Sequence, residues 1–286
     1  MGRSKSDAKI TMKKIWAYLK KDKKTALALG FLFSISLAGL LLPFLSIDPN
    51  NFDPLNIQGP QPPSWQHPFG TDDLGRDLLL RCIDGARVSL MVGLIAMSIA
   101  MSVGTFIGAI AAYIGGWVDQ LLMRILELFL AIPSIFLILT IQIMLKPSIY
   151  NVMIIIGLTS WMGVARLVRA ELLSIKERTF ITAARARNIA PLRLLFKHML
   201  PHAINPMIVA AMLGMGYAIL LESVLSFLGL GVQPPNASWG NMLENSLAFM
   251  RDAPWMALIP GLLITATVMA LNYLGDALRQ AWDPRA

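Results

Sequence analysis

Long apolar stretches separated by shorter polar segments dominate the chain. A helix needs roughly 20 apolar residues to cross a bilayer core about 30 Å thick. Helices are expected because a spanning segment must satisfy its own backbone hydrogen bonds, and short alternating strands typical of a barrel are missing from the sequence. The pattern therefore predicts an all-α integral membrane protein with six transmembrane helices. The six apolar stretches are Thr25 to Ile47, about Val88 to Trp117, Leu121 to Leu145, Ile149 to Val164, Ile204 to Leu230 and Pro254 to Leu278.

The N-terminal region resembles a signal peptide in having a basic stretch followed by an apolar one. The apolar stretch is 23 residues long, from Thr25 to Ile47, and no small-x-small cleavage site follows it. Cleaved signal peptides have shorter apolar regions and a cleavage site of that kind. We therefore expect an uncleaved membrane anchor.

Composition strengthens the membrane assignment. Apolar residues make up 56% of the chain, whereas charged residues make up 15%, well below the roughly 25% of an ordinary soluble domain. This balance excludes a disordered chain and argues against a soluble fold, because so much apolar surface could not be hidden from water. The single cysteine, Cys82, excludes an internal disulfide and a CxxC redox motif.

The formal charge of +8 records orientation rather than nucleic-acid binding. Of the 25 basic residues, nine precede Thr25, eight lie in residues 166–197, and Arg124, Arg279 and Arg285 bring this side of the membrane to 20. Because cytoplasmic loops carry an excess of Lys and Arg, both termini are expected in the cytoplasm. The other side holds the remaining five, which are Arg76, Arg81, Arg87, Lys146 and Arg251.

These assignments give a domain organisation in which a long cytoplasmic loop joins the fourth and fifth spans. The expected parts are a cytoplasmic tail (1–24), the first span (25–47), an extracytoplasmic loop (48–87), a five-helix core (88–281) that contains the inner loop (166–203), and a cytoplasmic C-terminus (282–286).

Small residues recur every fourth position in two spans, which lets helix backbones approach closely in lipid. Packing within this chain is the simpler interpretation, and packing against a second membrane subunit is the alternative. The stripe in the second span is Ala96, Ala100, Gly104, Gly108, Ala112 and Gly116, and that in the fifth is Ala210, Gly214, Ala218, Glu222 and Ser226.

Polar residues inside the spans are candidates for a translocation path. Glu222 lies on the small-residue face of the fifth span, and a carboxylate within a membrane marks either a pathway or a buried hydrogen-bonded group. Asn272 and Asp276 share one face of the sixth span with Thr265, and that face is a second candidate path lining.

Metal chemistry and ATP chemistry have no convincing motif in the sequence. His198 and His202 are four residues apart, but Pro201 is expected to interrupt the helix between them, and no HExxH pattern is present. Thr71 is expected to be a helix N-cap with Asp72 and Asp73 in the first turn, rather than part of a calcium site. No P-loop is present, so an ATPase that drives this protein would be another chain.

The inner loop is too polar to span a membrane, yet it has a helical pattern with breaks at residues 188–191 and at Pro201. Asn188 suits a left-handed turn. The segment either docks in the groove of a partner or lies as an amphipathic helix on anionic lipid. A short helix is expected to hold Thr182, Ala183, Ala184 and Arg185, and an apolar group near the membrane surface is expected to hold Leu192, Leu194, Leu195 and Phe196.

This loop resembles the EAA motif, EAA-x3-G-x9-I-x-LP, of the membrane subunits of bacterial ABC importers. Four positions match it and three depart, with Thr182 in place of Glu, Asn188 in place of Gly and His198 in place of Ile. Four further segments are similar to the second, C-type, permease of the dipeptide, oligopeptide and nickel importer family. They are HPFGTDDLGRDLL (67–79), GARVSL (85–90), ESVLSFLGLGVQPPNASWG (222–240) and DPR (283–285).

The resemblance implies a multi-pass permease subunit of the bacterial inner membrane that is not itself an enzyme. It implies a second homologous permease, two ATP-binding subunits that hold ATP and Mg, and an extracytoplasmic binding protein as partners. It implies no cofactor or metal in this chain, and an extracytoplasmic loop that helps to receive the binding protein or to guide the substrate. The implied ATPase-coupling residues are Thr182, Ala183, Ala184, Arg185, Asn188, Leu192 and Pro201.

Several functions remain open from the sequence. Di- and oligopeptides lead as substrates of an ABC importer, with nickel chelates and glutathione behind them. A carrier driven by an ion gradient through Glu222 and Asp276 is a different class, but such carriers typically show inverted repeats or helices interrupted at mid-membrane, and neither is evident in the sequence. A membrane scaffold without transport activity is the third alternative.

Overall fold

A computed structural model describes residues 22–45, 47–51 and 59–282. Every regular element in these ranges is helical, apart from one isolated antiparallel bridge between Thr71 and Asp77. The main helices are α2 (Lys23–Leu41), α3 (Leu78–Ile114), α4 (Gly116–Leu130), α5 (Ser134–Met144), α6 (Ile149–Lys176), α7 (Thr179–Ala186), α8 (Pro191–Leu194), α9 (Leu200–Phe227), α10 (Trp239–Ser246) and α11 (Trp255–Trp282). Short turns of helix are η1 (Leu42–Phe44), η2 (Leu195–Met199, a π-helix) and η3 (Leu247–Phe249).

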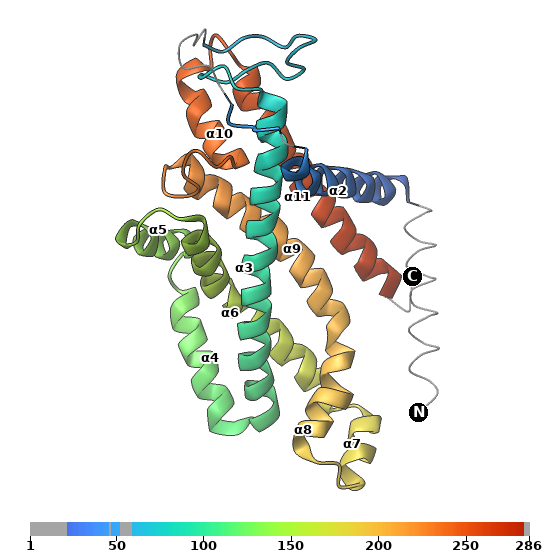
Figure 1. The fold of residues 1–286 in the computed structure, drawn as a ribbon. Coiled ribbons are helices and arrows are strands. Elements are labelled where there is room, and N and C mark those ends of the chain that lie inside the picture. Colours follow the sequence, from blue (N-terminus) through green and yellow to red (C-terminus); the bar gives the residue numbers. More distant parts are fainter. Residues whose placement is uncertain (1–21, 46, 52–58, 283–286) are drawn as a thin grey trace.

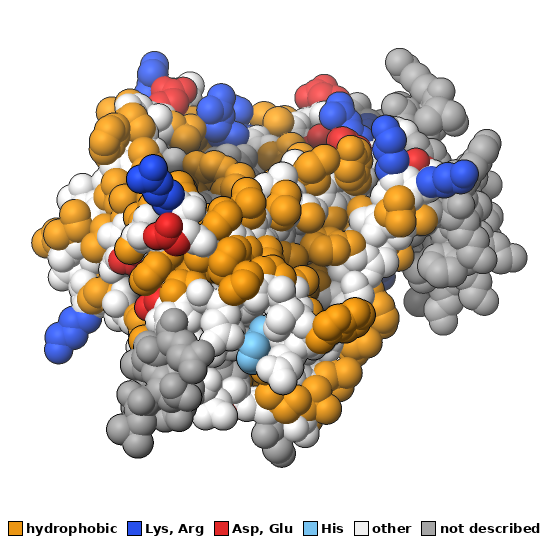
Figure 2. All heavy atoms as spheres, turned by 90° about the horizontal axis from the view of Figure 1, so that it is seen from above, with side chains coloured by type: hydrophobic (Ala, Val, Ile, Leu, Met, Phe, Trp, Pro, Cys, Tyr) orange, Lys and Arg blue, Asp and Glu red, His pale blue; other side chains and the backbone are white. Residues whose placement is uncertain are grey.

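The long helix α3 forms the spine of the molecule (Figure 1). One end of the molecule carries α10, and the opposite end carries α7 and α8; we call these the α10 end and the α7 end. Figure 2, seen from the α10 end, shows basic and acidic side chains scattered among a largely hydrophobic surface. Large exposed apolar side chains such as Leu27, Phe33 and Phe106 fit a molecule that is surrounded by lipid.

The predicted number of spans holds only if a bent pair of helices is counted as one. Five helical segments are long and apolar enough to cross a membrane by themselves, and α4 with α5 forms a sixth candidate that is bent by 78°. The stretch from Leu121 to Leu145, predicted as one transmembrane helix, is therefore divided into two helices. Pro133 explains the break, because proline lacks a backbone N–H and disfavours helical backbone in the residue before it.

Two helix boundaries differ from expectation for local reasons. α3 begins at Leu78 rather than Val88, and its N-cap is Asp77, whose Oδ1 accepts a bond from the Leu80 N–H at 3.0 Å. The expected cap, Thr71, is instead bridged to Asp77. α6 continues without interruption to Lys176, so the inner loop begins as an extension of the fourth span.

Backbone contact between α3 and α6 explains the small-residue stripe of the second span. A Cβ placed on Gly108 would lie 2.5 Å from the Ala165 carbonyl oxygen, and one placed on Gly104 would lie 2.6 Å from the Val164 Cβ. Gly157 makes the reciprocal contact from α6, because its Cβ would lie 2.9 Å from the Ala96 carbonyl oxygen. The part of the stripe from Ala96 to Ala112 therefore serves packing within this chain, whereas Gly116 lies beyond the end of α3 and is exposed.

Polar contacts fix the outer elements on this pair of helices. Arg169 of α6 and Asp119 of α4 form an ion pair through two hydrogen bonds. At the α10 end, the buried Trp239 donates from its indole nitrogen to the Cys82 carbonyl oxygen at 3.0 Å, which fixes the start of α10 against α3.

The two tails of the chain lie almost entirely outside the described residues. Of the predicted cytoplasmic tails, only residues 22–24 and 282 are described, and residues 52–58 of the predicted extracytoplasmic loop are also outside the described ranges. The side of the membrane on which each terminus lies stays a prediction.

Candidate functional site

The inner loop forms a compact helical structure at the α7 end. The expected short helix is present as α7, and Asn188 follows it with a left-handed φ of 55°. Pro201 does not end a helix, contrary to expectation. It lies in the first turn of α9, a position that tolerates proline because the N–H groups of the first turn have no partner within the helix. The π-helix η2 leads directly into α9.

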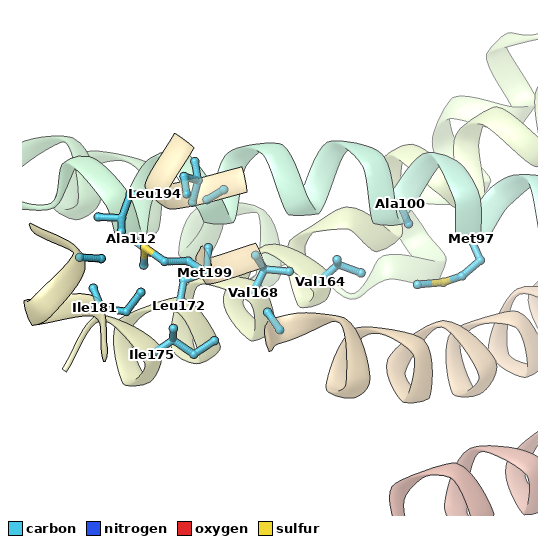
Figure 3. Packing of buried hydrophobic residues seen from close by; sticks show 14 residues of the cluster. Met97, Ala100, Ala112, Val164, Val168, Leu172, Ile175, Ile181, Leu194 and Met199 are labelled. Atoms are coloured by element: carbon cyan, nitrogen blue, oxygen red, sulfur yellow. The ribbon is translucent and has the colours of Figure 1, made fainter. Parts of the chain in front are cut away.

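A buried apolar cluster attaches the inner loop to the spans (Figure 3). Ile181 of α7 and Met199 of η2 are completely buried, and they belong to the same cluster as Leu172 and Ile175 of α6. Ala112 near the end of α3 belongs to it as well. The inner loop is therefore firmly packed against the spans. A force applied to α7 would reach α6 and α9 through packed side chains.

One face of α7 is left free by this packing. Thr182, Ala183 and Arg185 are exposed, whereas Ala184 is 8% exposed and belongs to the buried cluster. The predicted apolar group is divided in the same way, because Leu194 and Leu195 are buried while Leu192 and Phe196 are exposed. The two adjacent alanines consequently have different environments, and only Ala183 faces outward.

The left-handed turn at Asn188 can be tested by substitution. Replacing Asn188 with glycine should keep α7 in place, whereas replacing it with isoleucine should destabilise the loop by about 1–2 kcal/mol, because a β-branched residue is strained at positive φ. Limited proteolysis of the inner loop in the purified protein would measure the difference. Equal protection of the two variants would contradict a left-handed turn at this position.

The three candidate path residues are not gathered at one site. Glu222 is completely buried in α9, where it accepts hydrogen bonds from Ser89 of α3 at 3.1 Å and from Ser226 at 2.7 Å. Asn272 and Asp276 are exposed on α11. Glu222 therefore joins α3 to α9, while the two α11 residues lie on an outer surface.

Two features were missed by sequence reasoning. The first is a buried charged cluster at the α10 end, which Asp72, Arg76 and Arg81 form together. Asp72 and Arg76 have helical i,i+4 spacing, which was a usable signal, but Arg81 joins them only through the fold. Burial, reinforced by the negative charge of Asp72, raises the pKa of the neighbouring Asp73 carboxyl above its usual range.

The second feature is a cavity of about 320 Å³ beside the break between α4 and α5. It is lined by Leu130 and Ser134 on either side of the break, by Ser160 and Gly163 of α6, and by Tyr217 of α9. Ser134 and Tyr217 lie 3.2 Å apart, oxygen to oxygen. Most of its wall is apolar, and the lining residues with hydroxyl groups are Ser134, Thr159, Ser160 and Tyr217.

The residues described by the structure contain no group of three His, Cys, Asp or Glu side chains suited to a metal ion. His198 and His202 follow one another through η2 into α9 and, within the described residues, have no carboxylate or thiol that would complete a site with them.

Several helices of membrane length and a packed inner loop between two of them define a multi-span membrane protein. The chain belongs to the family of binding-protein-dependent transport system inner membrane components, whose model matches residues 104–286. It is a permease subunit of an ABC importer, a kind of subunit that is not an enzyme and that works with ATPase activity in separate subunits.

Relatives match over nearly the whole chain. The dipeptide transport system permease protein DppC of Alkalihalophilus pseudofirmus is 42% identical over 93% of this chain and 88% of its own length. DppC of Haemophilus influenzae is 35% identical over 97% and 96% of the two chains. The oligopeptide transport system permease protein OppC of Bacillus subtilis is 34% identical over 93% and 87%.

The fold is shared with a solved transporter of the same class. An inward-facing structure of the MetNI methionine ABC transporter superimposes with a TM-score of 0.60, covering 71% of this chain and 97% of the other. The sequence identity is 16%, so this similarity concerns the fold alone.

Proposed function

We propose that this chain forms half of the translocation path of an importer for di- and oligopeptides in a bacterial inner membrane. The observation that carries the proposal is the 34–42% identity, over more than nine-tenths of the chain, to permeases named for dipeptide and oligopeptide transport. Uptake of labelled dipeptides by the complete transporter in proteoliposomes tests it. Nickel uptake without peptide uptake would contradict it.

The proposed complex contains a second homologous permease, two ATP-binding subunits that hold ATP and Mg, and an extracytoplasmic binding protein. Both termini and the α7 end face the cytoplasm in this arrangement. The excess of basic residues in the inner loop supports that orientation, because Lys and Arg accumulate in cytoplasmic loops. The α10 end, with the described part of the loop 48–87, then faces the binding protein.

The inner loop is the proposed contact with the ATPase subunits. Its exposed face carries Thr182, Ala183 and Arg185, its C-terminal turn contains Asn188, and Leu192 lies exposed after the turn. Ala184 supports this surface from behind, because it packs into the buried cluster, whereas Pro201 is exposed in the first turn of α9. A rigid helix attached to α6 and α9 can transmit movement of the ATPase subunits to the spans.

Replacing Ala183 with tryptophan should weaken binding of the ATPase subunits and lower peptide-stimulated ATP hydrolysis. The added side chain projects from the free face of α7 and would obstruct a docked surface without disturbing the core. Co-purification of the ATPase subunits with this chain, followed by ATPase assay of the purified complex, measures both effects.

Ala26 provides a matched control, because it is an exposed alanine in the first turns of α2, a helix that lies apart from α7 (Figure 1). Ala26→Trp should leave assembly and ATPase activity unchanged. Ala184 is unsuitable for this test, since a larger side chain there would damage the buried cluster directly. Full assembly and full ATPase stimulation of the Ala183→Trp complex would overturn the coupling role of this face.

A further inference from the structure

The break between α4 and α5 leaves helix ends at the depth of the membrane. It lies near the middle of α3 in Figure 1, and Met97, close to the midpoint of α3, lines the cavity beside it. Pro133 has no N–H, and α5 begins without a side-chain cap. The N–H groups of a first helical turn have no partner within the helix, so some backbone groups at this break need partners from elsewhere.

Lipid cannot supply those partners. Irregular backbone at membrane depth is tolerated only where it is buried in protein or lines a water-filled space. Ala131, Ile132 and Pro133 are all exposed on this chain, so the chain itself does not bury the break. The face that carries the break must therefore be turned towards water or towards another protein.

The cavity beside the break has a mostly apolar wall with a few neutral hydroxyl groups. Its volume of about 320 Å³ lies within the roughly 300–1,000 Å³ of small-molecule sites. Ser134, Ser160 and Tyr217 contribute neutral hydroxyl groups, and none of the lining residues is charged. Such a wall can pack against apolar parts of a peptide and offer it a few hydroxyl partners, and it makes no demand on the charge of the peptide's side chains.

We propose that this cavity is the part of the chain that contacts the passing peptide, with Ser160 and Tyr217 as its polar contacts. The inference rests on the proposed peptide-import function and deepens it. It moves the path away from the three residues that the sequence favoured, because Glu222 is enclosed between α3 and α9, and Asn272 and Asp276 lie on α11, which does not line the cavity.

Gly163 allows a clean test. It lies on the cavity wall, and no heavy atom within 4 Å would meet a Cβ added to it, so a cysteine fits without strain. The one native cysteine, Cys82, is 1% exposed and should not react. Gly30 of α2 is the matched control, because it is also an exposed helical glycine with nothing within 4 Å of an added Cβ, and it lines no part of the cavity.

The experiment labels Gly163→Cys and Gly30→Cys in the complete transporter in proteoliposomes with a charged, membrane-impermeant thiol reagent, with and without ATP. Mass spectrometry of this chain measures labelling, and dipeptide uptake is measured before and after. We expect Gly163→Cys to be labelled, to be protected by excess dipeptide, and to lose uptake on labelling. We expect Gly30→Cys to remain unlabelled and to keep full uptake.

Absence of labelling at Gly163→Cys in every state would overturn the proposal, since the partner permease or lipid would then seal the cavity. Labelling without loss of uptake would overturn it as well, because transport would then continue with a bulky group attached to the cavity wall. Failure of the unmodified transporter to import any dipeptide would count against the proposed substrate instead. In that event, the labelling pattern would still decide whether the cavity is water-filled.

Discussion

Replacing Asp72 with alanine is expected to destabilise the α10 end by about 3–5 kcal/mol, the usual cost of removing one partner from a buried ion pair. Asp72 is 4% exposed, and its Oδ2 lies 2.6 Å from the Arg76 Nε and 3.2 Å from the Arg81 Nε. Both arginines are buried as well, with exposed fractions of 6% for Arg76 and 2% for Arg81. Loss of Asp72 would leave two buried positive charges with reduced compensation.

Asp72 also organises the backbone of this segment. Its Oδ1 accepts hydrogen bonds from the Leu74 N–H at 3.0 Å and the Arg76 N–H at 2.9 Å, which shapes the turn that leads into α3. Arg81 in turn donates to the Asn50 side chain at 2.6 Å and so connects the segment that follows α2. The damage should therefore spread from the turn to the start of α3.

Hydrogen exchange of the amides between residues 70 and 81 would measure the effect. A loss of 3 kcal/mol corresponds to roughly a hundredfold faster exchange through local opening. Asp252→Ala is the control, because Asp252 is an exposed carboxylate at the same end. Arg76→Met should cost less than Asp72→Ala, since Asp72 keeps Arg81 as a partner. Unchanged exchange in Asp72→Ala would show that the cluster contributes nothing to stability.

The length of the apolar stretches predicted the main spans, and the pattern of the inner loop predicted a short helix followed by a break. Both features depend on local sequence. The left-handed turn at Asn188 is a property of one residue type and was predicted correctly. The sequence did not show which helix packs against the small-residue stripe, since any closely approaching helix, in this chain or in another subunit, would explain the small residues. The structure decides it through the backbone contacts of Gly104 and Gly108 with α6.

Features that depend on geometry at a distance were not predictable in this way. Run length treats Ile132 and Pro133 as two more apolar residues, although they bend the third span. Arg81 joins Asp72 only once α3 is placed. Glu222 shows the same limitation, because its position on the small-residue face was recognised, but its hydroxyl partner Ser89 lies on another helix, far away in sequence. Polarity alone therefore did not reveal that Glu222 is enclosed between α3 and α9.

Replacing Gly108 with leucine is expected to abolish correct folding, and even alanine should destabilise the protein. In an ordinary helix, exchange of glycine for alanine stabilises by roughly 0.5–1 kcal/mol. At Gly108 the new Cβ would lie 2.5 Å from the Ala165 carbonyl oxygen and 3.1 Å from the Arg169 backbone nitrogen. Because these are backbone atoms, no side-chain rotation can relieve the contact, and the cost of overpacking, typically about 1–3 kcal/mol, should exceed the gain.

Gly30 gives the opposite sign with the same substitution. It lies inside α2, and an added Cβ would meet nothing within 4 Å, so Gly30→Ala should stabilise the helix. Thermal unfolding of the detergent-solubilised protein should therefore rank Gly30→Ala at or above the parent and Gly108→Ala below it, with Gly108→Leu recovered only as aggregate. Helix propensity favours both alanine variants equally, so the difference between them isolates the packing of α3 against α6. If Gly108→Ala stabilised the protein as Gly30→Ala does, the two helices would not lie in backbone contact.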